Sequence, residues 1–182
     1  MAREVFGEMT RMIDRTYLTA MSRNSLSLPM KWLRDNGFLG GKCLDFGCGR
    51  GYDSRSLKID CYDPYWTKGM IESPDGGRVS IDDVDLDSYN TITCIYVMNV
   101  IPSKFDRDGI VVRMRNLLTL GGTIYVAVRR DVKIEGYNSK GNYQANVSMD
   151  FPVLVEFPGK FCIYSINWLK LNYFPTIDSP YI

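Results

Sequence analysis

The chain has 182 residues, of which 45% are hydrophobic and 24% are charged, and this composition fits one globular domain with its own hydrophobic core. Its formal net charge of +1 argues against a protein that coats nucleic acid by charge alone, while leaving room for a local basic patch. Histidine is absent, so histidine-based catalytic triads and histidine-ligated metal sites are excluded.

Two helices are expected before the first strand. Apolar residues at helical spacing predict a helix over residues 3–15. A second helix is expected to begin after Ser27, a capping residue, with Pro29 in its first turn, and to end at Asn36-Gly37. Both belong to an N-terminal helical segment over residues 1–38.

Strands and helices then alternate through residues 42–130. Apolar strands are predicted at 42–46, 58–62, 91–97 and 123–128, with helices at 52–57 and 106–118. Residues 67–80 are rich in glycine, serine, proline and charge, and are expected to be mostly loop. Gly121-Gly122 is expected to end the second of these helices. The alternation predicts an α/β fold with a mostly parallel sheet covered by helices.

Residues 141–182 are expected to add C-terminal strands. The β-prone runs 153–155 and 161–164 are joined by Pro158-Gly159-Lys160, which is a hairpin signal. This hairpin is expected to lie antiparallel at one edge of the sheet. We therefore interpret residues 1–182 as a single domain with its ligand-binding core at 42–130.

The five cysteines form no C-x-x-C pair, so zinc binding and thioredoxin-type chemistry are not expected. Buried free thiols in a reducing cytosol are the simplest interpretation. No signal peptide and no stretch long enough to span a bilayer are recognised. The expectation is a cytoplasmic protein without a metal site and without membrane contact.

The chemistry is expected at the glycine-rich turn after the first strand, which reads L-D-F-G-C-G-R-G from Leu44. Glycines permit a tight turn and a close approach of a ligand, and ligands of open α/β sheets bind at the carboxyl ends of the strands. The G-x-G-x-G spacing fits neither the dinucleotide fingerprint G-x-G-x-x-G nor a phosphate-binding P-loop. Asp45 would repel a pyrophosphate and attract a cation, such as the amino group of S-adenosylmethionine.

Acidic residues at later strand ends complete the expected cofactor site. Asp63 ends the second predicted strand and would accept hydrogen bonds from ribose hydroxyls, unless it only begins a turn with Pro64. Tyr65 is a candidate for stacking on adenine, with a surface or a core position as the alternative, and Asp82 or Asp83 is a candidate for binding the adenine amino group. The predicted cofactor-binding residues are therefore Asp45, Gly47, Cys48, Gly49, Gly51, Asp63, Pro64, Tyr65 and Asp82.

These features resemble the class I S-adenosylmethionine-dependent methyltransferases. The resemblance rests on the glycine turn, the strand-end Asp63, the apolar strand ending at Tyr96, and L-x-x-G-G-T-I-Y-V from Leu118, and it covers about residues 42–130. It implies a Rossmann-like three-layer sandwich of about seven strands, the last one antiparallel. It also implies S-adenosyl-L-methionine as the cofactor, lying across the glycine turn.

A narrower resemblance concerns the runs Y-D-P-Y-W from Tyr62, Y-V-M-N-V-I from Tyr96 and A-V-R-R-D from Ala127. They are similar to uncharacterised methyltransferase-like proteins of phages and of bacterial DNA-modification loci. This similarity implies a nucleic-acid setting, so nucleic acid or a nucleotide is the favoured methyl acceptor. The D/N-P-P-Y/F motif of DNA-amino methyltransferases and the Pro-Cys motif of C5-cytosine enzymes are both missing.

Asn99 and Tyr96 are the candidate catalytic residues, expected to line the methyl-transfer pocket. Capping by Asn99 and packing by Tyr96 are the alternatives, and Arg129, Arg130 and Asp131 are interpreted as a solvated surface cluster. Methyl transfer needs chiefly a positioned nucleophile, which a histidine-free chain can supply.

Three functions stay open. The chain is a methyltransferase acting on nucleic acid or a nucleotide, one acting on a small molecule or a protein side chain, or a methyltransferase-like module that binds a partner without catalysis. An NAD-dependent oxidoreductase is disfavoured by the glycine spacing and by Asp45.

Overall fold

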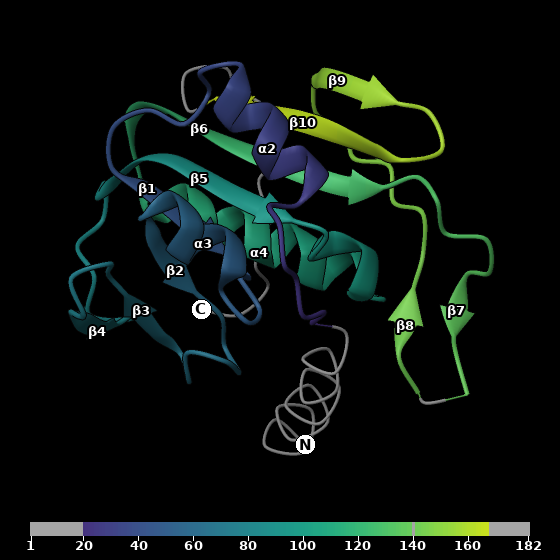
Figure 1. Cartoon of the computed structure of the whole chain (residues 1–182), viewed down its shortest axis with the longest axis horizontal. Coiled ribbons are helices and arrows are strands. Elements are labelled where there is room, and N and C mark those ends of the chain that lie inside the picture. The colour runs from purple at the N-terminus through teal and green to yellow at the C-terminus, as the bar shows by residue number, and fades with distance from the viewer. Residues whose placement is uncertain (1–19, 140, 168–182) are drawn as a thin grey trace, which may run out of the picture.

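The computed structural model describes residues 20–139 and 141–167, in which one eight-stranded sheet carries helices on both faces (Figure 1). The α/β class expected from the sequence is therefore confirmed for these residues. The helix predicted over residues 3–15 lies outside the described part of the chain.

Four neighbouring parallel strands form the centre of the sheet, in the order β2 (Asp60–Tyr62), β1 (Cys43–Phe46), β5 (Tyr89–Ile95) and β6 (Leu118–Arg129). The chain proceeds from β1 to β2 on one side and later returns to β5 on the other side. The strand order thus reverses at β1. Ligands of open α/β sheets bind at such a reversal, outside the carboxyl ends of the strands.

In the described part of the chain, three α-helices cover the two faces of this sheet. Helices α2 (Leu28–Asp35) and α3 (Tyr52–Leu57) lie on one face, and α4 (Lys104–Asn116) lies on the other (Figure 1). The capping signals before α2 act as predicted, because the Ser27 hydroxyl accepts a hydrogen bond from the Met30 amide and the helix ends before Asn36. A 3-10 turn, η2 (Met98–Val100), follows β5.

The alternating side chains of the strands divide the core into two clusters, one on each face of the sheet. Under α4 lie Ile92, Cys94, Ile124 and Val126, packed with Val111 and Met114 of the helix. On the opposite face, Leu33 of α2 packs with Tyr125, Ala127, Phe161 and Ile163. The sheet and the helices packed on each of its faces form the three layers of the fold.

The prediction that residues 67–80 are mostly loop misses two short strands within this range. Strands β3 (Met70–Glu72) and β4 (Arg78–Ser80) form an antiparallel hairpin that extends the sheet beyond β2. Each has three residues, too few for a recognisable alternation, and β3 depends on the exposed edge of β2 for its pairing. Ile71, which is buried, anchors this hairpin in the core.

The prediction that Gly121-Gly122 ends a helix is wrong. Helix α4 ends at Asn116, and β6 begins at Leu118 and continues through both glycines. The register of β6 against β5 shifts at this point, and Gly121 has a φ of +79°. A Cβ at Gly122 would lie 2.9 Å from the carbonyl oxygen of Asn90, so the glycine permits close packing of the two strands.

The sheet has more strands, and more antiparallel pairing, than predicted. Eight strands pair through three parallel and four antiparallel ladders, where a mostly parallel sheet of about seven strands was expected. At the C-terminal edge, β10 (Phe161–Asn167) pairs antiparallel with β6, and β9 (Val153–Phe157) pairs with β10. A separate two-stranded sheet consists of β7 (Gly136–Tyr137) and β8 (Tyr143–Gln144). Among the described helices, none is both long and apolar enough to cross a membrane.

Candidate functional site

The glycine loop, residues 47–51, connects β1 to α3 at the strand reversal. The amides of Gly47 and Cys48 both donate to the carbonyl oxygen of Tyr62, at 2.7 and 3.0 Å, so the loop is fixed to the end of β2. The amide of Gly51 donates to the Cys48 carbonyl at 3.0 Å. All three glycines of the loop have φ between +54° and +77°, a region that other residues rarely adopt.

Asp63 joins the glycine loop to the turn after β2. Its Oδ2 accepts a hydrogen bond from the Gly49 amide at 3.0 Å, and its Oδ1 accepts from the amides of Tyr65 and Trp66, both at 2.9 Å. A carboxylate offers about four acceptor positions, so about one is left for a ligand hydroxyl. The sequence suggested that Asp63 would accept two hydroxyls. The structure places it beside the glycine loop but assigns most of its capacity to the backbone.

Asp45 is buried beneath the glycine loop, with 3% of its surface exposed. Thr93 donates a hydrogen bond to its Oδ1 at 3.2 Å, and no lysine or arginine of the described residues forms an ion pair with it. Burial, followed by the nearby carboxylate of Asp53, raises the pKa of Asp45 to about 8. A buried acid that lacks a cation is suited to a ligand with a positive group, because ionisation then becomes favourable.

The turn after β2 presents aromatic rings beside the loop. Tyr65 and Trp66, which follow Pro64, are both exposed and pack edge to face with ring centroids 5.6 Å apart. The guanidinium of Arg50, from the glycine loop, lies 4.8 Å from the centroid of the Trp66 ring. The predicted stacking candidate Tyr65 is therefore accessible and lies next to the loop through the bond of its amide to Asp63.

Two other predicted cofactor residues have different surroundings. Asp82 forms an ion pair with Arg113 of α4, and its side chain is 79% exposed. This pairing draws Asp82 toward α4, and no described contact joins it to the glycine loop. Cys48 is half-buried, and its thiol is hydrogen-bonded to that of Cys61 in β2, which lowers the pKa of Cys61 to about 7. The cysteines Cys43, Cys61, Cys94 and Cys162 have free and buried thiols.

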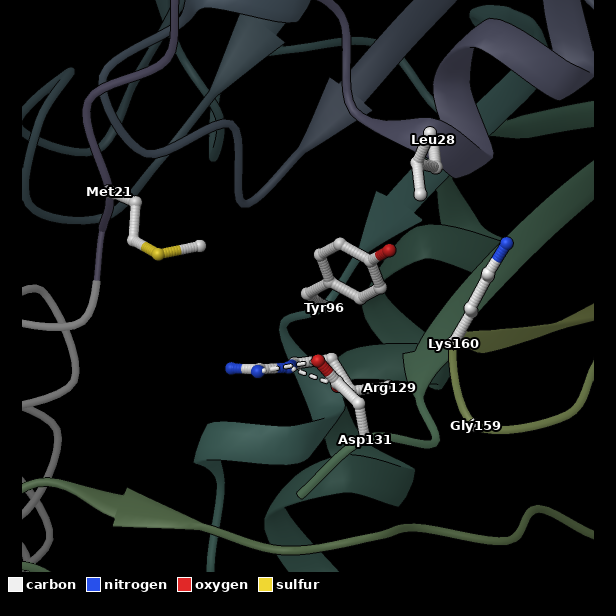
Figure 2. Close-up of a pocket in the computed structure, with 7 residues that line it drawn as sticks. All are labelled: Met21, Leu28, Tyr96, Arg129, Asp131, Gly159 and Lys160. Atoms are coloured by element: carbon white, nitrogen blue, oxygen red, sulfur yellow. Dashed lines mark hydrogen bonds and ion pairs between the residues drawn. The ribbon is translucent and has the colours of Figure 1, made fainter. Parts of the chain in front are cut away.

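Tyr96, at the end of β5, lines a cavity of about 180 Å³ (Figure 2). Its φ is +64°, an unfavourable value for an aromatic residue, and its amide donates to the Ala127 carbonyl at 2.8 Å. Strain of this kind is concentrated at functional sites. Burial raises the pKa of Tyr96 to about 12, so its hydroxyl keeps its proton at neutral pH and can donate a hydrogen bond.

The same cavity contains charged residues that the sequence interpretation treated as a surface cluster. Arg129 donates to both carboxylate oxygens of Asp131, at 2.8 and 3.0 Å, and the hydrogen bond from Arg129 lowers the pKa of Asp131. Lys160, in the turn between β9 and β10, also lines the cavity (Figure 2). The signal that could have identified Arg129 and Asp131 is their position directly after a buried parallel strand.

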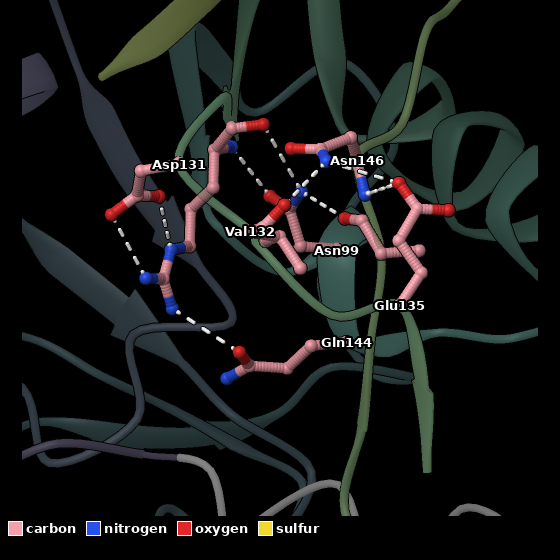
Figure 3. Close-up of polar contacts among 8 residues, drawn as sticks. Asn99, Asp131, Val132, Glu135, Gln144 and Asn146 are labelled. Carbon is pink, nitrogen blue, oxygen red and sulfur yellow. Dashed lines mark hydrogen bonds and ion pairs between the residues drawn. The ribbon is translucent and has the colours of Figure 1, made fainter. Parts of the chain in front are cut away.

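Asn99, the other catalytic candidate, is fully buried and does not belong to the lining of this cavity. Its Oδ1 accepts from the Arg129 amide at 2.7 Å, and its Nδ2 donates to the Ala145 carbonyl at 2.7 Å (Figure 3). The amide of Ala145 donates in turn to the Asn99 carbonyl at 2.9 Å. Through these bonds Asn99, which belongs to η2, links the end of β6 to the segment before β9.

Two short segments connect the glycine loop with the cavity. A Cβ at Gly49 would lie 3.1 Å from the Cβ of Ala20, and a Cβ at Gly47 would clash with Val97. The next residue along the chain from Ala20 is Met21, and the residue before Val97 is Tyr96, and both line the cavity. The loop and the cavity are therefore neighbours at the carboxyl ends of β1 and β5.

Comparison with known proteins adds structural neighbours but no sequence relatives. No family model and no curated protein matches the chain. The solved S-adenosylmethionine-dependent methyltransferase from Mesorhizobium loti matches with 11% identity and a TM-score of 0.49, covering 76% of this chain and 97% of that one. The antibiotic-resistance methyltransferase Kmr matches with 14% identity and a TM-score of 0.40, covering 81% and 97%. Likeness at this level carries no information on function, which must be argued from the residues of the chain.

Proposed function

We propose that the chain binds S-adenosylmethionine at the glycine loop and transfers its methyl group to an acceptor held beside Tyr96. One observation carries this proposal: the loop at the strand reversal lies between two carboxyl groups, and Asp45, the buried one, has no cation among the described residues. A phosphate-bearing cofactor would keep Asp45 protonated and would gain no attraction from it. A cofactor with an ammonium and a sulfonium group is attracted.

The residues around the glycine loop fit both the amino acid part and the adenosine part of this cofactor. Asp45 and the backbone of the glycine loop would hold its amino acid part, with Gly47, Cys48, Gly49 and Gly51 leaving the space free of side chains. Asp63 would accept a hydrogen bond from a ribose hydroxyl at its remaining acceptor position, and Tyr65 with Pro64 would face the adenine. When bound, the cofactor supplies a methyl group that is already activated by its positive sulfur.

The chain's own residues would then position the acceptor. Tyr96 donates a hydrogen bond to it, since its raised pKa keeps the hydroxyl protonated. The Arg129–Asp131 pair offers a fixed donor and acceptor array on the neighbouring wall. Orientation of this kind supplies most of the rate enhancement in a displacement that needs no early proton transfer. The cavity of about 180 Å³ suits a group of about one ring, because pockets for whole drug-sized ligands are about 300 Å³ or larger.

Calorimetry with S-adenosylmethionine, its demethylated product S-adenosylhomocysteine, and NAD tests the cofactor. We expect heat of binding with the first two compounds and none with NAD. Asp63→Ala should weaken binding by about tenfold or more, because it removes both a ligand contact and the bond to the Gly49 amide. Asp82→Ala is the matched control, since this carboxylate is occupied by Arg113, and its affinity should equal that of the parent. Absence of heat with both sulfur compounds would refute the proposal.

Transfer itself is tested with a tritiated methyl donor. We expect label on nucleic acid or nucleotides, the favoured acceptors, and loss of transfer without loss of cofactor affinity in Tyr96→Phe. Cofactor binding without transfer to nucleic acid, small molecules or protein would instead identify a module that binds a partner without catalysis.

A further inference from the structure

The arm, residues 131–139 and 141–146, follows β6 and projects from the sheet (Figure 1), and Asp131 at its base lines the cavity. It carries β7 and β8, which pair only with each other. A two-stranded ribbon alone is marginally stable, so its orientation depends on contacts at its base.

Hydrogen bonds at the base hold the arm in one orientation (Figure 3). Asn99 bonds to the backbone at both ends of the arm, through the Arg129 amide and the Ala145 carbonyl. Asn146 links the two segments of the arm, because it donates hydrogen bonds to Glu135 Oε1 at 3.0 Å and to the Val132 carbonyl at 2.8 Å. The base of the arm is therefore positioned by these polar contacts together with Ala145 and Tyr143, which pack against the core under α4.

Arg129 connects the arm to the cavity. Its guanidinium lines the cavity beside Tyr96, binds Asp131, and also donates to Gln144 Oε1 of β8 at 3.4 Å. A molecule whose reacting group enters the cavity can therefore extend along the arm.

The exposed chemistry of the arm is aromatic and amide-rich. Tyr137 is 60% exposed, and its ring packs edge to face against Tyr143 with centroids 5.3 Å apart. Asn138, Asn142 and Gln144 are next to these two tyrosines in the sequence, with Asn138 exposed and Asn142 and Gln144 half-buried. Aromatic rings on which bases stack, with amides that reach base edges, are the means by which proteins bind single-stranded nucleic acid.

The charges beside the arm favour a polyanion. Lys133 of the arm and Lys160 at the cavity form no ion pair with any described carboxylate. Of the two acidic residues of the arm, Asp131 is paired with Arg129, whereas Glu135 accepts hydrogen bonds from the neutral Asn146 and keeps its negative charge. Among the described residues, Arg129, Lys133 and Lys160 against Asp131 and Glu135 leave one net positive charge around the arm and the cavity.

We propose that the arm binds single-stranded nucleic acid, with Tyr137 stacking on a base and Lys133 and Lys160 facing the phosphates. The inference rests on the proposed function and deepens it, since it names a nucleic-acid strand as the source of the methyl acceptor. Binding of the strand itself requires no cofactor and can be measured separately.

Fluorescence anisotropy with labelled 12-nucleotide DNA and RNA strands, and with the matching duplexes, tests the arm in the full chain without cofactor. We expect single strands to bind more tightly than duplexes, and the comparison of DNA with RNA identifies the source. Tyr137→Ala should weaken binding by about fivefold or more, whereas Tyr137→Trp should retain it. Phe105→Ala is the matched control, because this aromatic residue is 73% exposed on α4, outside the arm, and its loss should change nothing.

Three results would overturn the inference: no binding of single strands, equal affinity of Tyr137→Ala and the parent, or methyl label found on protein with nucleic acid unlabelled. Failure of the cofactor calorimetry with strand binding intact would refute the proposed function and leave strand binding by the arm standing. The two outcomes are therefore distinguishable.

Discussion

At the scale of single residues, Asp45 couples the stability of the protein to pH. Its pKa is about 8 in the folded chain, against an ordinary value of 3.8. Between these two values the folded state holds a proton that the unfolded state has released. The contribution of Asp45 to the free energy of unfolding is therefore greatest at low pH, falls as the pH rises from about 4, and is lost above about 8.

Asp45→Asn should remove this dependence, because an amide is neutral at every pH. We expect the stability of the variant relative to the parent to increase by at least about 1 kcal/mol between pH 5 and pH 9. That corresponds to a relative gain of about 2–4 °C in Tm for a chain of this size. Thermal melts of both proteins at pH 5, 7 and 9 measure the effect. A difference that stays constant across this range would show that Asp45 is ionised throughout.

The same residue predicts that cofactor binding releases a proton. A positive group placed near Asp45 lowers its pKa, so the parent should lose close to one proton at pH 7 when S-adenosylmethionine binds. Calorimetry in two buffers with different ionisation enthalpies measures this release. Asp45→Asn should bind more weakly and show the same heat in both buffers. Identical heats for the parent in both buffers would remove Asp45 from the cofactor contact.

At the scale of elements, Gly47 and Gly69 provide a matched test of the glycine loop. Both have left-handed backbones, with φ of +77° and +74°, but a Cβ at Gly47 clashes with Val97 whereas a Cβ at Gly69 meets nothing within 4 Å. Gly69→Ala should cost about 1–2 kcal/mol in free energy of unfolding from backbone strain alone. Gly47→Ala should cost about 1–3 kcal/mol more.

Denaturant unfolding of the two variants measures this difference, and the double variant Gly47→Ala with Val97→Ala locates its cause. Removing the Val97 methyl groups should recover most of the excess cost. Equal costs for the two single variants would mean that the loop and the residue after Tyr96 do not pack together as described.

Elements with local signals were predictable from the sequence. The capping hydroxyl of Ser27 defines the start of α2, and Pro158-Gly159-Lys160 marks the turn between β9 and β10. Strands β3 and β4 were not predictable, because three-residue strands depend on pairing with β2, which the local sequence does not encode. The glycines at 121–122 resemble a helix end, yet their position is decided by close contact with β5.

The candidate site also contains residues that the sequence could predict and residues that it could not. The positions of Asp45, the glycine loop and Asp63 in the sequence were enough to predict that they lie close together, because strand ends in a parallel sheet share one edge. Asn99 and Arg129 could not be assigned, since their partners come from distant segments. Asn99 bonds to Ala145, 46 residues along the chain, and this contact places its amide in the core, outside the cavity.

At the scale of the whole molecule, three features lie at one edge of the sheet, beside the strand reversal. The glycine loop follows β1, the cavity follows β5, and the arm follows β6, which are three adjacent strands. Ala145 and Tyr143 of the arm pack against the core, and Asn99 links the base of the arm to the sheet through hydrogen bonds. A variant at Asn99 can therefore distinguish a structural role from the catalytic role that the sequence suggested.

Asn99→Ala leaves the Arg129 amide and the Ala145 carbonyl without their partner, so we expect a loss of about 2–4 kcal/mol in free energy of unfolding. Proteolysis should cut the released arm faster, and single-strand affinity should fall, while the affinity for S-adenosylmethionine stays that of the parent. Asn90→Ala is the control, because this amide also bonds at two positions, to the Lys42 amide and to Thr119, outside the arm. It should leave arm cleavage and strand affinity unchanged. If Asn99→Ala instead kept full stability and lost only methyl transfer, Asn99 would be a catalytic residue and the arm would be held by other contacts.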